Sequence, residues 1–575
     1  MNKTDLIKKV KALEGLTQDE RAYLVNLVNT KKKYGLVWED KPEEVEEQLR
    51  ENLPVLKEVK EKAIINGEEH PNHILIEGDN LHALTALTFT HEGKIDVIYI
   101  DPPYNTGNKD FRYNDTFKDE YIDRENPFRH STWLSFMSRR LKIAKRLLKD
   151  SGVIFISIDD NEQSQLKLLC DEVYFESNYI ATPVRRRRGS QANLSKNIST
   201  IHEYVLIYVK SGVAELNKLK PSINENDYKN PDNDPRGPYV TMPCTNKGGS
   251  KYTIITPTGK EISDEWRFKI ETFNQLKDDN RLVYPKGGEG KPRYKLFLSE
   301  KTESGVIDNS WWESIATNQE ATIELKEILP DNNFNNPKPV GLINHILKLS
   351  TQSNKTNLIL DFFAGSGTTL HATMALNAED GGNRQCILVT NNENNICEEV
   401  TYERNKRVIQ GYTNAKGLAV EGLSHNNLRY YKSEFVSREP SLKNKRQLTQ
   451  LATELLCIKE DCYTEQKINI KQARLFANNK VTLLILFDDH IIPQAVEFIK
   501  TLEAPEIKVY VFSMGSDPYT EDFAAVLDKV TLCALPDAIY KAYQNVLPKK
   551  YRIVPIIEEE VETPTNESGE QLFNI

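Results

Sequence analysis

The chain has 575 residues, of which 39% are hydrophobic, so it is long enough for a large core and accessory domains. Its seven cysteines show neither CxxC nor Cys/His metal-ligand spacing, which argues against a disulfide framework and a zinc site. No apolar run approaches the roughly 18 residues that a membrane helix needs, and the amino terminus lacks an apolar signal core. We therefore expect a cytoplasmic protein with no metal and no membrane contact.

The net charge of −9 and the pI of about 5.8 argue, taken alone, against a nucleic-acid partner. The charges are unevenly distributed, however. Residues 181–250 contain eleven Lys or Arg and six Asp or Glu, whereas the segment Glu558–Glu570 contains six glutamates and no basic residue. Because a phosphate-binding surface needs only a local positive field, the basic middle of the chain keeps DNA open as a partner.

Residues 1–65 form the first predicted segment, which is charged and patterned as helices around Leu6–Val10 and Glu43–Leu53. It contains no catalytic motif, so we predict a helical association segment. Residues 66–210 then alternate between strands and helices, which indicates an α/β parallel sheet. The elements expected there are strands at Ile74–Asp79, Ile95–Ile100, Val153–Ile158 and His202–Val209, and helices at Leu81–Leu87 and Ser135–Lys149.

The alternation stops in residues 211–330, where turn-forming residues dominate, and we interpret this range as an inserted module. It resumes in residues 331–445 with an amphipathic helix after Pro339 and strands at Asn357–Leu360 and Gln385–Thr390. For residues 446–575 we predict a separate small α/β domain that ends in the acidic tail. Five segments are therefore expected.

The catalytic candidates are Asp101, Pro102, Pro103 and Tyr104, directly after the strand Ile95–Ile100. An exocyclic amine on a planar base is a poor nucleophile because its lone pair is delocalised into the ring. The Asp101 carboxylate and the Pro102 carbonyl could accept its two N–H groups and free the lone pair, while the prolines rigidify the loop. Tyr104 would stack on a base swung out of the duplex. The alternative is an ordinary turn at the end of a strand.

The second motif, residues 361–369, follows the strand Asn357–Leu360 and is a glycine loop. Gly365 and Gly367 permit a close approach of a cofactor to the backbone. The chain contains neither GxGxxG nor the Walker lysine, which disfavours NAD and ATP. An acid at the end of the next strand would bind ribose hydroxyls. The expected cofactor contacts are Asp361, Phe363, Gly365, Gly367 and Thr368 in the loop, Glu393 at the next strand end, and Asp79, which could instead cap the helix that follows it.

The catalytic motif precedes the cofactor motif in this chain. In this arrangement the two motifs, DPPY at 101–104 and FxGxG at 363–367, resemble those of the beta class of amino methyltransferases that act on DNA. Asn336–Pro339 resembles the segment before the cofactor loop in that class, which adds Lys338 and Pro339 to the expected cofactor site. Residues Cys397–Arg404 and Asn427–Tyr431 are similar to modification (Mod) subunits of type III restriction-modification systems.

The resemblance implies a Rossmann-like, S-adenosylmethionine-dependent methyltransferase fold of the α/β class that is circularly permuted. The inserted module would be its target recognition domain, followed by the small C-terminal α/β domain. It implies methylation of adenine N6 in double-stranded DNA, S-adenosyl-L-methionine as cofactor with no metal, a homodimer, and a Res helicase-nuclease partner. If the fold is a parallel sheet, the strands ending at Asp101 and Asp361 must be neighbours.

Arg185, Arg186, Arg187 and Arg188 are the DNA-binding candidates. Four adjacent arginines repel one another unless an anion is near, which favours DNA phosphates over a merely solvated charge run. Three other functions stay open: methylation of cytosine N4 or of an RNA base, a DNA-reading scaffold that has lost catalysis, and a nucleotide-dependent oxidoreductase.

Overall fold

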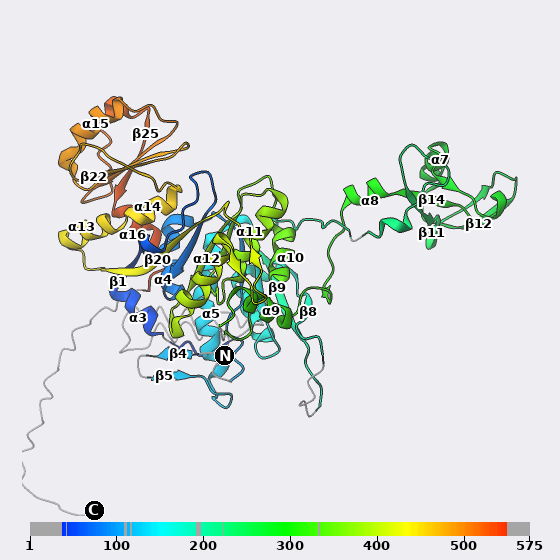
Figure 1. Cartoon of the computed structure of the whole chain (residues 1–575), viewed down its shortest axis with the longest axis horizontal. Coiled ribbons are helices and arrows are strands. Elements are labelled where there is room, and N and C mark those ends of the chain that lie inside the picture. Colours follow the sequence, from blue (N-terminus) through cyan, green and yellow to red (C-terminus); the bar gives the residue numbers. More distant parts are fainter. Residues whose placement is uncertain are drawn as a thin grey trace, which may run out of the picture. The chain divides into compact units, whose positions relative to one another are not determined.

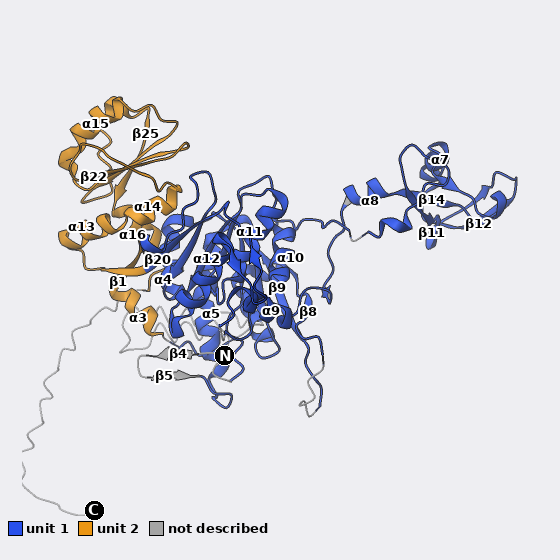
Figure 2. Cartoon of the chain, in the orientation of Figure 1, with its two compact units in different colours: residues 1–41, 58–113, 120–432 blue, residues 42–57, 114–119, 433–575 orange. Residues whose placement is uncertain are grey.

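The structure is a computed structural model that describes residues 37–41, 43–107, 112–115, 118–190, 197–221, 223–331 and 334–548. The chain divides into two compact units, which Figure 2 draws in different colours. Unit 1 comprises residues 1–41, 58–113 and 120–432, and unit 2 comprises residues 42–57, 114–119 and 433–575. The predicted helix at Leu6–Val10 and the acidic tail Glu558–Glu570 lie outside the described residues.

A large, mostly parallel sheet forms the centre of unit 1 (Figure 1). Its strands are ordered β20-β2-β17-β16-β3-β6-β9-β8-β15, and β7 pairs with β9. The strands from β20 to β6 are parallel, and β9 is antiparallel to both β6 and β8. The bounds are β2 Asn72–Glu77, β3 Ile95–Ile100, β6 Leu148–Ile158, β7 Tyr179–Ala181, β8 Val184–Arg186, β9 His202–Val209, β15 Trp311–Trp312, β16 Leu358–Asp361, β17 Gln385–Thr390 and β20 Asn427–Ser437.

Helices cover the sheet because its parallel strands are apolar on both faces. Val97 and Ile359 of the sheet share one core with Leu342 and Leu370 of two of these helices. The predicted α/β class is confirmed, and the predicted strands and helices of this unit are present, although α5 and β6 begin five or six residues earlier than expected. The helices are α4 Asn80–His91, α5 Arg129–Leu147, α6 Gln163–Cys170, α9 Asn318–Ile328, α10 Val340–Ser350, α11 Thr368–Asp380 and α12 Glu403–Gln410.

The two motif-bearing strands are neighbours. β16 pairs in parallel with β3, with Ile359 opposite Val97 and Leu360 opposite Ile98. Parallel strands end at the same edge of a sheet, so the loops that follow Ile100 and Asp361 meet there. The expected adjacency of the motifs is confirmed, whereas a circular permutation stays a prediction.

The inserted module has its own small core, made of Cys244, Ile254, Trp266 and Phe273. The end of the predicted range 211–330 belongs elsewhere, because β15 pairs with β8 and α9 packs on the main core. Within β15, Trp312 is buried and Trp311 is exposed. The role of the module as a target reader stays a prediction. Its elements are β10 Tyr239–Pro243, β11 Thr245–Ile255, β12 Glu261–Trp266, α7 Ile270–Asp278, β13 Leu282–Val283, β14 Arg293–Phe297 and α8 Leu298–Ser304.

Unit 2 contains a five-stranded sheet of order β21-β22-β23-β24-β25, in which β23, β24 and β25 are parallel. The expected C-terminal α/β fold is therefore present, and α3 belongs to the same unit. No helix of the described residues has the length and apolarity to cross a bilayer. The bounds are α3 Glu44–Glu51, β1 Asn52–Glu58, α13 Leu442–Leu451, α14 Thr453–Glu460, β21 Glu465–Gln466, β22 Ala473–Ala477, β23 Thr482–Leu486, α15 Ile492–Lys500, β24 Ile507–Phe512, β25 Val530–Leu535 and α16 Asp537–Tyr543.

Candidate active site

The catalytic loop, residues 101–104, follows β3, and a side chain of α5 hydrogen-bonds to its backbone. Trp133 donates its indole N–H to the carbonyl of Pro103 (2.7 Å). Asn105 adopts a left-handed backbone conformation (φ 57°) and donates from Nδ2 to Glu162 Oε1 (2.5 Å). These bonds fix both ends of the short segment that carries Tyr104. The loop is therefore a rigid support for the groups that would contact a base.

The ammonium of Lys338, a residue just before α10, contacts side chains of the catalytic loop. Its ammonium donates to Tyr104 Oη (2.7 Å) and forms ion pairs with Asp101 Oδ1 (3.1 Å) and Glu203 Oε2 (3.2 Å). Tyr104 Oη in turn donates to Glu203 Oε2 (3.3 Å). The other oxygen of Glu203 accepts from Arg185, so the loop is linked to β8 and β9 through buried charges.

The two carboxylates of this network have opposite pKa shifts. Burial raises the pKa of Asp101, against the opposing effect of Lys338, and the charge of Glu203 raises it further. Burial would also raise the pKa of Glu203, but Lys338 and Arg185 lower it below its usual value. The ionised form of Glu203 is therefore favoured, whereas the charge of Asp101 depends on the groups around it, above all Lys338 and Glu203.

The glycine loop is ordered by the carboxylate of Asp361. This carboxylate accepts from the backbone N–H of Phe363 (3.0 Å) and from the hydroxyl of Thr369 in α11 (2.5 Å). Burial raises its pKa to about 7, despite both hydrogen bonds. Asp361 therefore closes the loop onto the first turn of α11 and titrates near neutral pH.

Gly365 and Gly367 both have left-handed backbone conformations, with φ values of 50° and 73°. A Cβ atom at Gly367 would clash with Asn405 Nδ2, so any other residue there would strain the backbone and force Asn405 to shift. The buried guanidinium of Arg404 donates to the hydroxyls of Ser366 (3.0 Å) and Thr368 (2.8 Å). The loop is therefore built from its own glycines and from α12 together.

A pocket joins the two loops, and its residues fit the expected cofactor. Glycine backbone, three aromatic rings and the carboxylates of Asp101 and Asp361 line it, which suits a ligand that carries an adenine ring and positive charges. The lining residues are Tyr99, Asp101, Phe334, Asn336, Pro337, Lys338, Asp361, Phe363, Ala364, Gly365, Ser366, Thr368 and Thr369.

The remaining predicted cofactor residues have less direct positions. Asp79 accepts from the backbone N–H of Leu81 (2.7 Å), so its capping interpretation is confirmed, and its cofactor contact stays a prediction. Pro339 is the residue before α10, and Glu393 opens the turn after β17. Lys338 contributes its carbonyl to Thr368 (3.0 Å), but its ammonium serves the catalytic loop.

The four arginines do not form one surface stripe, which corrects the prediction for Arg185. Arg185 is fully buried, because Glu203 and the carbonyl of Ala316 satisfy its guanidinium. Arg186 is half-exposed and Arg188 is exposed. Arg187 and Arg188 line a second, polar pocket, and none of its described lining residues is acidic. The pocket consists of Arg187, Arg188, Gly189, Ser190, Asn318, Gln319, Thr322 and Asn336.

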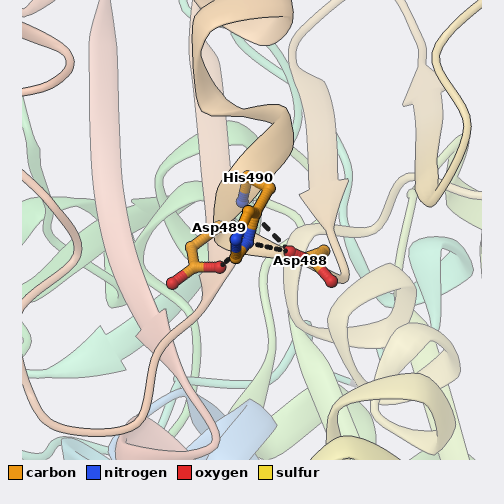
Figure 3. A group of neighbouring side chains, drawn as sticks. All are labelled: Asp488, Asp489 and His490. Atoms are coloured by element: carbon orange, nitrogen blue, oxygen red, sulfur yellow. Dashed lines mark hydrogen bonds and ion pairs between the residues drawn. The ribbon is translucent and has the colours of Figure 1, made fainter.

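Three potential metal ligands meet in unit 2, although the sequence predicted no metal site. Asp488, Asp489 and His490 follow β23 and have ligand atoms within 4.8 Å of one another (Figure 3). His490 is exposed, and its Nδ1 lies 2.9 Å from Asp488 and 2.8 Å from Asp489. Hydrogen bonds within the cluster account for this arrangement.

Glu203, Arg404 and Asn405 are site residues that the sequence analysis did not single out. A glutamate next to the apolar run of β9 was a visible signal, because a charge beside a buried strand requires a partner. Arg404 stands in a segment already noted for its resemblance to Mod subunits. Nothing local in the sequence indicated that Asn405 would pack against Gly367.

Comparison with known proteins identifies the family. Residues 95–409 match the family model described as DNA methylase. The chain is 38% identical over 350 residues to the Mod subunit of the type III restriction-modification enzyme StyLTI from Salmonella typhimurium, covering 56% of this chain and 53% of the relative. It is 30% identical over 482 residues to the EcoP15I Mod subunit from Escherichia coli, covering 71% of each.

The match spans about half the length of the StyLTI subunit. Among solved structures, the PvuII DNA methyltransferase (cytosine-N4-specific) is 10% identical, with 58% of this chain and 88% of that chain covered and a TM-score of 0.33. A TM-score at this level does not by itself establish a shared fold. The family model and the Mod relatives carry the assignment, and the chain therefore belongs to the DNA methylase family.

Proposed function

We propose that the protein transfers a methyl group from S-adenosylmethionine to the N6 atom of an adenine in double-stranded DNA. One observation carries the proposal: the Asp101 loop and the glycine loop leave neighbouring strands and line one pocket. Chemistry between a base and a cofactor requires the two reacting atoms to be about 3 to 3.5 Å apart. Two loops at the same sheet edge would bring a bound base and a bound cofactor next to each other, which supports the proposal.

The residues of the catalytic loop would prepare the amine. The Asp101 carboxylate and the Pro102 carbonyl accept its two N–H bonds, and the ring of Tyr104 stacks on the extruded base. The bound cofactor supplies an electrophilic methyl group on a sulfonium. Transfer of this methyl group would form the N–C bond while the C–S bond breaks with its electron pair on sulfur, and Asp101 would accept the proton that the nitrogen loses.

DNA would be held by the inserted module, through base contacts from its polar side chains, and by the polar pocket that contains Arg187 and Arg188. Asn336 lines both this pocket and the cofactor pocket, so a strand held there could continue to the catalytic loop. We further propose, as the sequence motifs led us to expect, a cytoplasmic homodimer that works with a Res subunit; the relatives support this in that they are named as subunits of restriction-modification enzymes.

The test is single-molecule sequencing of DNA from cells that express this chain, combined with nucleoside analysis of DNA methylated by the purified protein. We expect N6-methyladenine on one strand of an asymmetric site. A product that is only N4-methylcytosine would assign the other exocyclic amine. Nicotinamide binding without S-adenosylmethionine binding would overturn the methyltransferase assignment.

A further inference from the structure

Lys338 occupies the place that the catalytic loop offers to a base. Its ammonium pairs with Asp101 Oδ1 (3.1 Å), the carboxylate that would accept from the target amine. The same nitrogen lies 4.9 Å from the centroid of the Tyr104 ring, the surface on which the base would stack. An ammonium N–H and an amine N–H both donate to a carboxylate oxygen. Lys338 and the base therefore compete for the carboxylate of Asp101.

Glu203 offers the ammonium a second position. It lies 3.2 Å from Lys338 Nζ, it is fully buried, and its other oxygen is bound by Arg185. Arg185 is itself fixed by the carbonyl of Ala316 and by Asn318 Oδ1 (3.0 Å). Nothing in the expected chemistry assigns Glu203 to the base. The ammonium can therefore leave Asp101 without losing all its ionic contacts, which would be costly in a buried site.

We propose that Lys338 is a positioning residue that occupies the amine position of Asp101 while no base is bound and moves onto Glu203 when the base enters. The inference rests on the proposed function. In the empty site Lys338 favours the ionised form of Asp101 and orients it. In the occupied site Glu203, which is itself held by Arg185, binds the ammonium away from the base, so that Asp101 faces the amine alone.

The charges around Asp101 predict opposite pH effects for two variants. Lys338 is the cation that faces it, and Glu203, Tyr99, Tyr104 and Asp361 are its other titratable neighbours, with Arg185 behind Glu203. Without Lys338, burial and Glu203 both disfavour the charged carboxylate. With Glu203 neutralised, Lys338 pairs with Asp101 alone and Arg185 adds an uncompensated positive charge.

The experiment measures kcat/KM for DNA against pH in the full chain and in two variants. In Lys338→Met the acid limb should move up by about one pH unit or more, because the pKa of Asp101 rises. In Glu203→Gln the limb should move down, and the KM for DNA should rise because the base must displace a tighter ion pair. Shifts of opposite sign are not expected from a merely structural role.

A second readout follows entry of the base without chemistry. In a duplex with 2-aminopurine at the target position, Lys338→Met should give a larger fluorescence increase on binding than the parent, and Glu203→Gln a smaller one. Lys338→Arg should restore the position of the acid limb at least partly, because it restores the charge.

A matched control exists in unit 2, where Lys508 binds Glu460 (2.6 Å) and Glu506 (3.4 Å), and Tyr510 donates to the same Glu460 (2.6 Å). Lys508→Met should leave the pH profile and the 2-aminopurine signal unchanged. Acid limbs that move in the same direction in Lys338→Met and Glu203→Gln, or not at all, overturn the inference. A parent protein that methylates no DNA overturns the proposed function instead. If Lys338→Met does not fold, the downward shift in Glu203→Gln decides alone.

Discussion

In both units of the molecule, parallel strands end in acidic side chains. In unit 1, β16 ends at Asp361 beside the strand that leads to Asp101, and in unit 2, β23 is followed by Asp488 and Asp489. In unit 1 the carboxylate of Asp361 is buried and that of Asp101 is partly buried, and they bind backbone, hydroxyl and ammonium groups. In unit 2 both carboxylates are partly buried and bond to an exposed histidine. The same topology thus positions acids at both sheet edges, but burial and partners set their chemistry.

The largest effect that we expect is a loss of methylation on substitution of an acid at the sheet edge of unit 1, compared with an acid at the sheet edge of unit 2. Asp101→Asn should lower the methylation rate by about 10²–10⁴-fold, because the amide cannot accept the proton of the amine. Asp489→Asn in unit 2 should leave the rate unchanged. Single-turnover methylation with saturating cofactor measures both. An Asp101→Asn enzyme as fast as the parent would remove Asp101 from the mechanism.

The glycine loop can be tested against a second glycine on the same helix. Gly367 and Gly381 flank α11 with φ values of 73° and 69°, but a Cβ atom meets Asn405 only at Gly367. Gly381→Ala should cost about 1 kcal/mol from its left-handed backbone alone. Gly367→Ala should cost more and should also weaken S-adenosylmethionine binding. Calorimetry and thermal melts measure the difference, and equal effects would show that the contact with Asn405 is unimportant.

The raised pKa of Asp361 predicts that stability and cofactor binding both depend on pH. Its folded-state pKa of about 7 is raised, so its protonated form stabilises the apo protein and this stability is lost as the pH rises through 7. A cationic ligand prefers the ionised carboxylate, so the affinity for S-adenosylmethionine should fall below pH 7, by at most about tenfold per pH unit. Titration calorimetry from pH 5.5 to 8.5 tests both the parent and Asp361→Asn, in which this dependence should vanish.

The smallest effect concerns the polar pocket of unit 1. Arg188 is exposed there, whereas Arg185 is buried, although both belong to the same run of four arginines in the sequence. Arg188→Ala should weaken DNA binding evenly across sequences and reduce the salt slope of the binding constant by about 1. Lys500→Ala on the surface of α15 is the control. If the slope of Arg188→Ala equals that of the parent, Arg188 does not contact a phosphate.

Much of the fold was accessible from the sequence because strand and helix periodicity is local. The strand His202–Val209 was predicted with its observed bounds, and the neighbouring positions of β3 and β16 followed from the rule that ligands bind at the carboxyl ends of parallel strands. The inserted module was harder to delimit. Its irregular sequence continues into β15 and α9, which belong to the main sheet and core only through long-range pairing.

The sequence by itself determined the two motifs, their order and the type of chemistry, because these depend on residue identity and short spacing. Only the tertiary structure decided which charges meet. Lys338 reaches Tyr104 across 234 positions and Glu203 across 135, and Arg185 turns inward to Glu203 while Arg188 stays exposed. A buried charge is stable only beside a partner, and the fold chooses that partner from the whole chain.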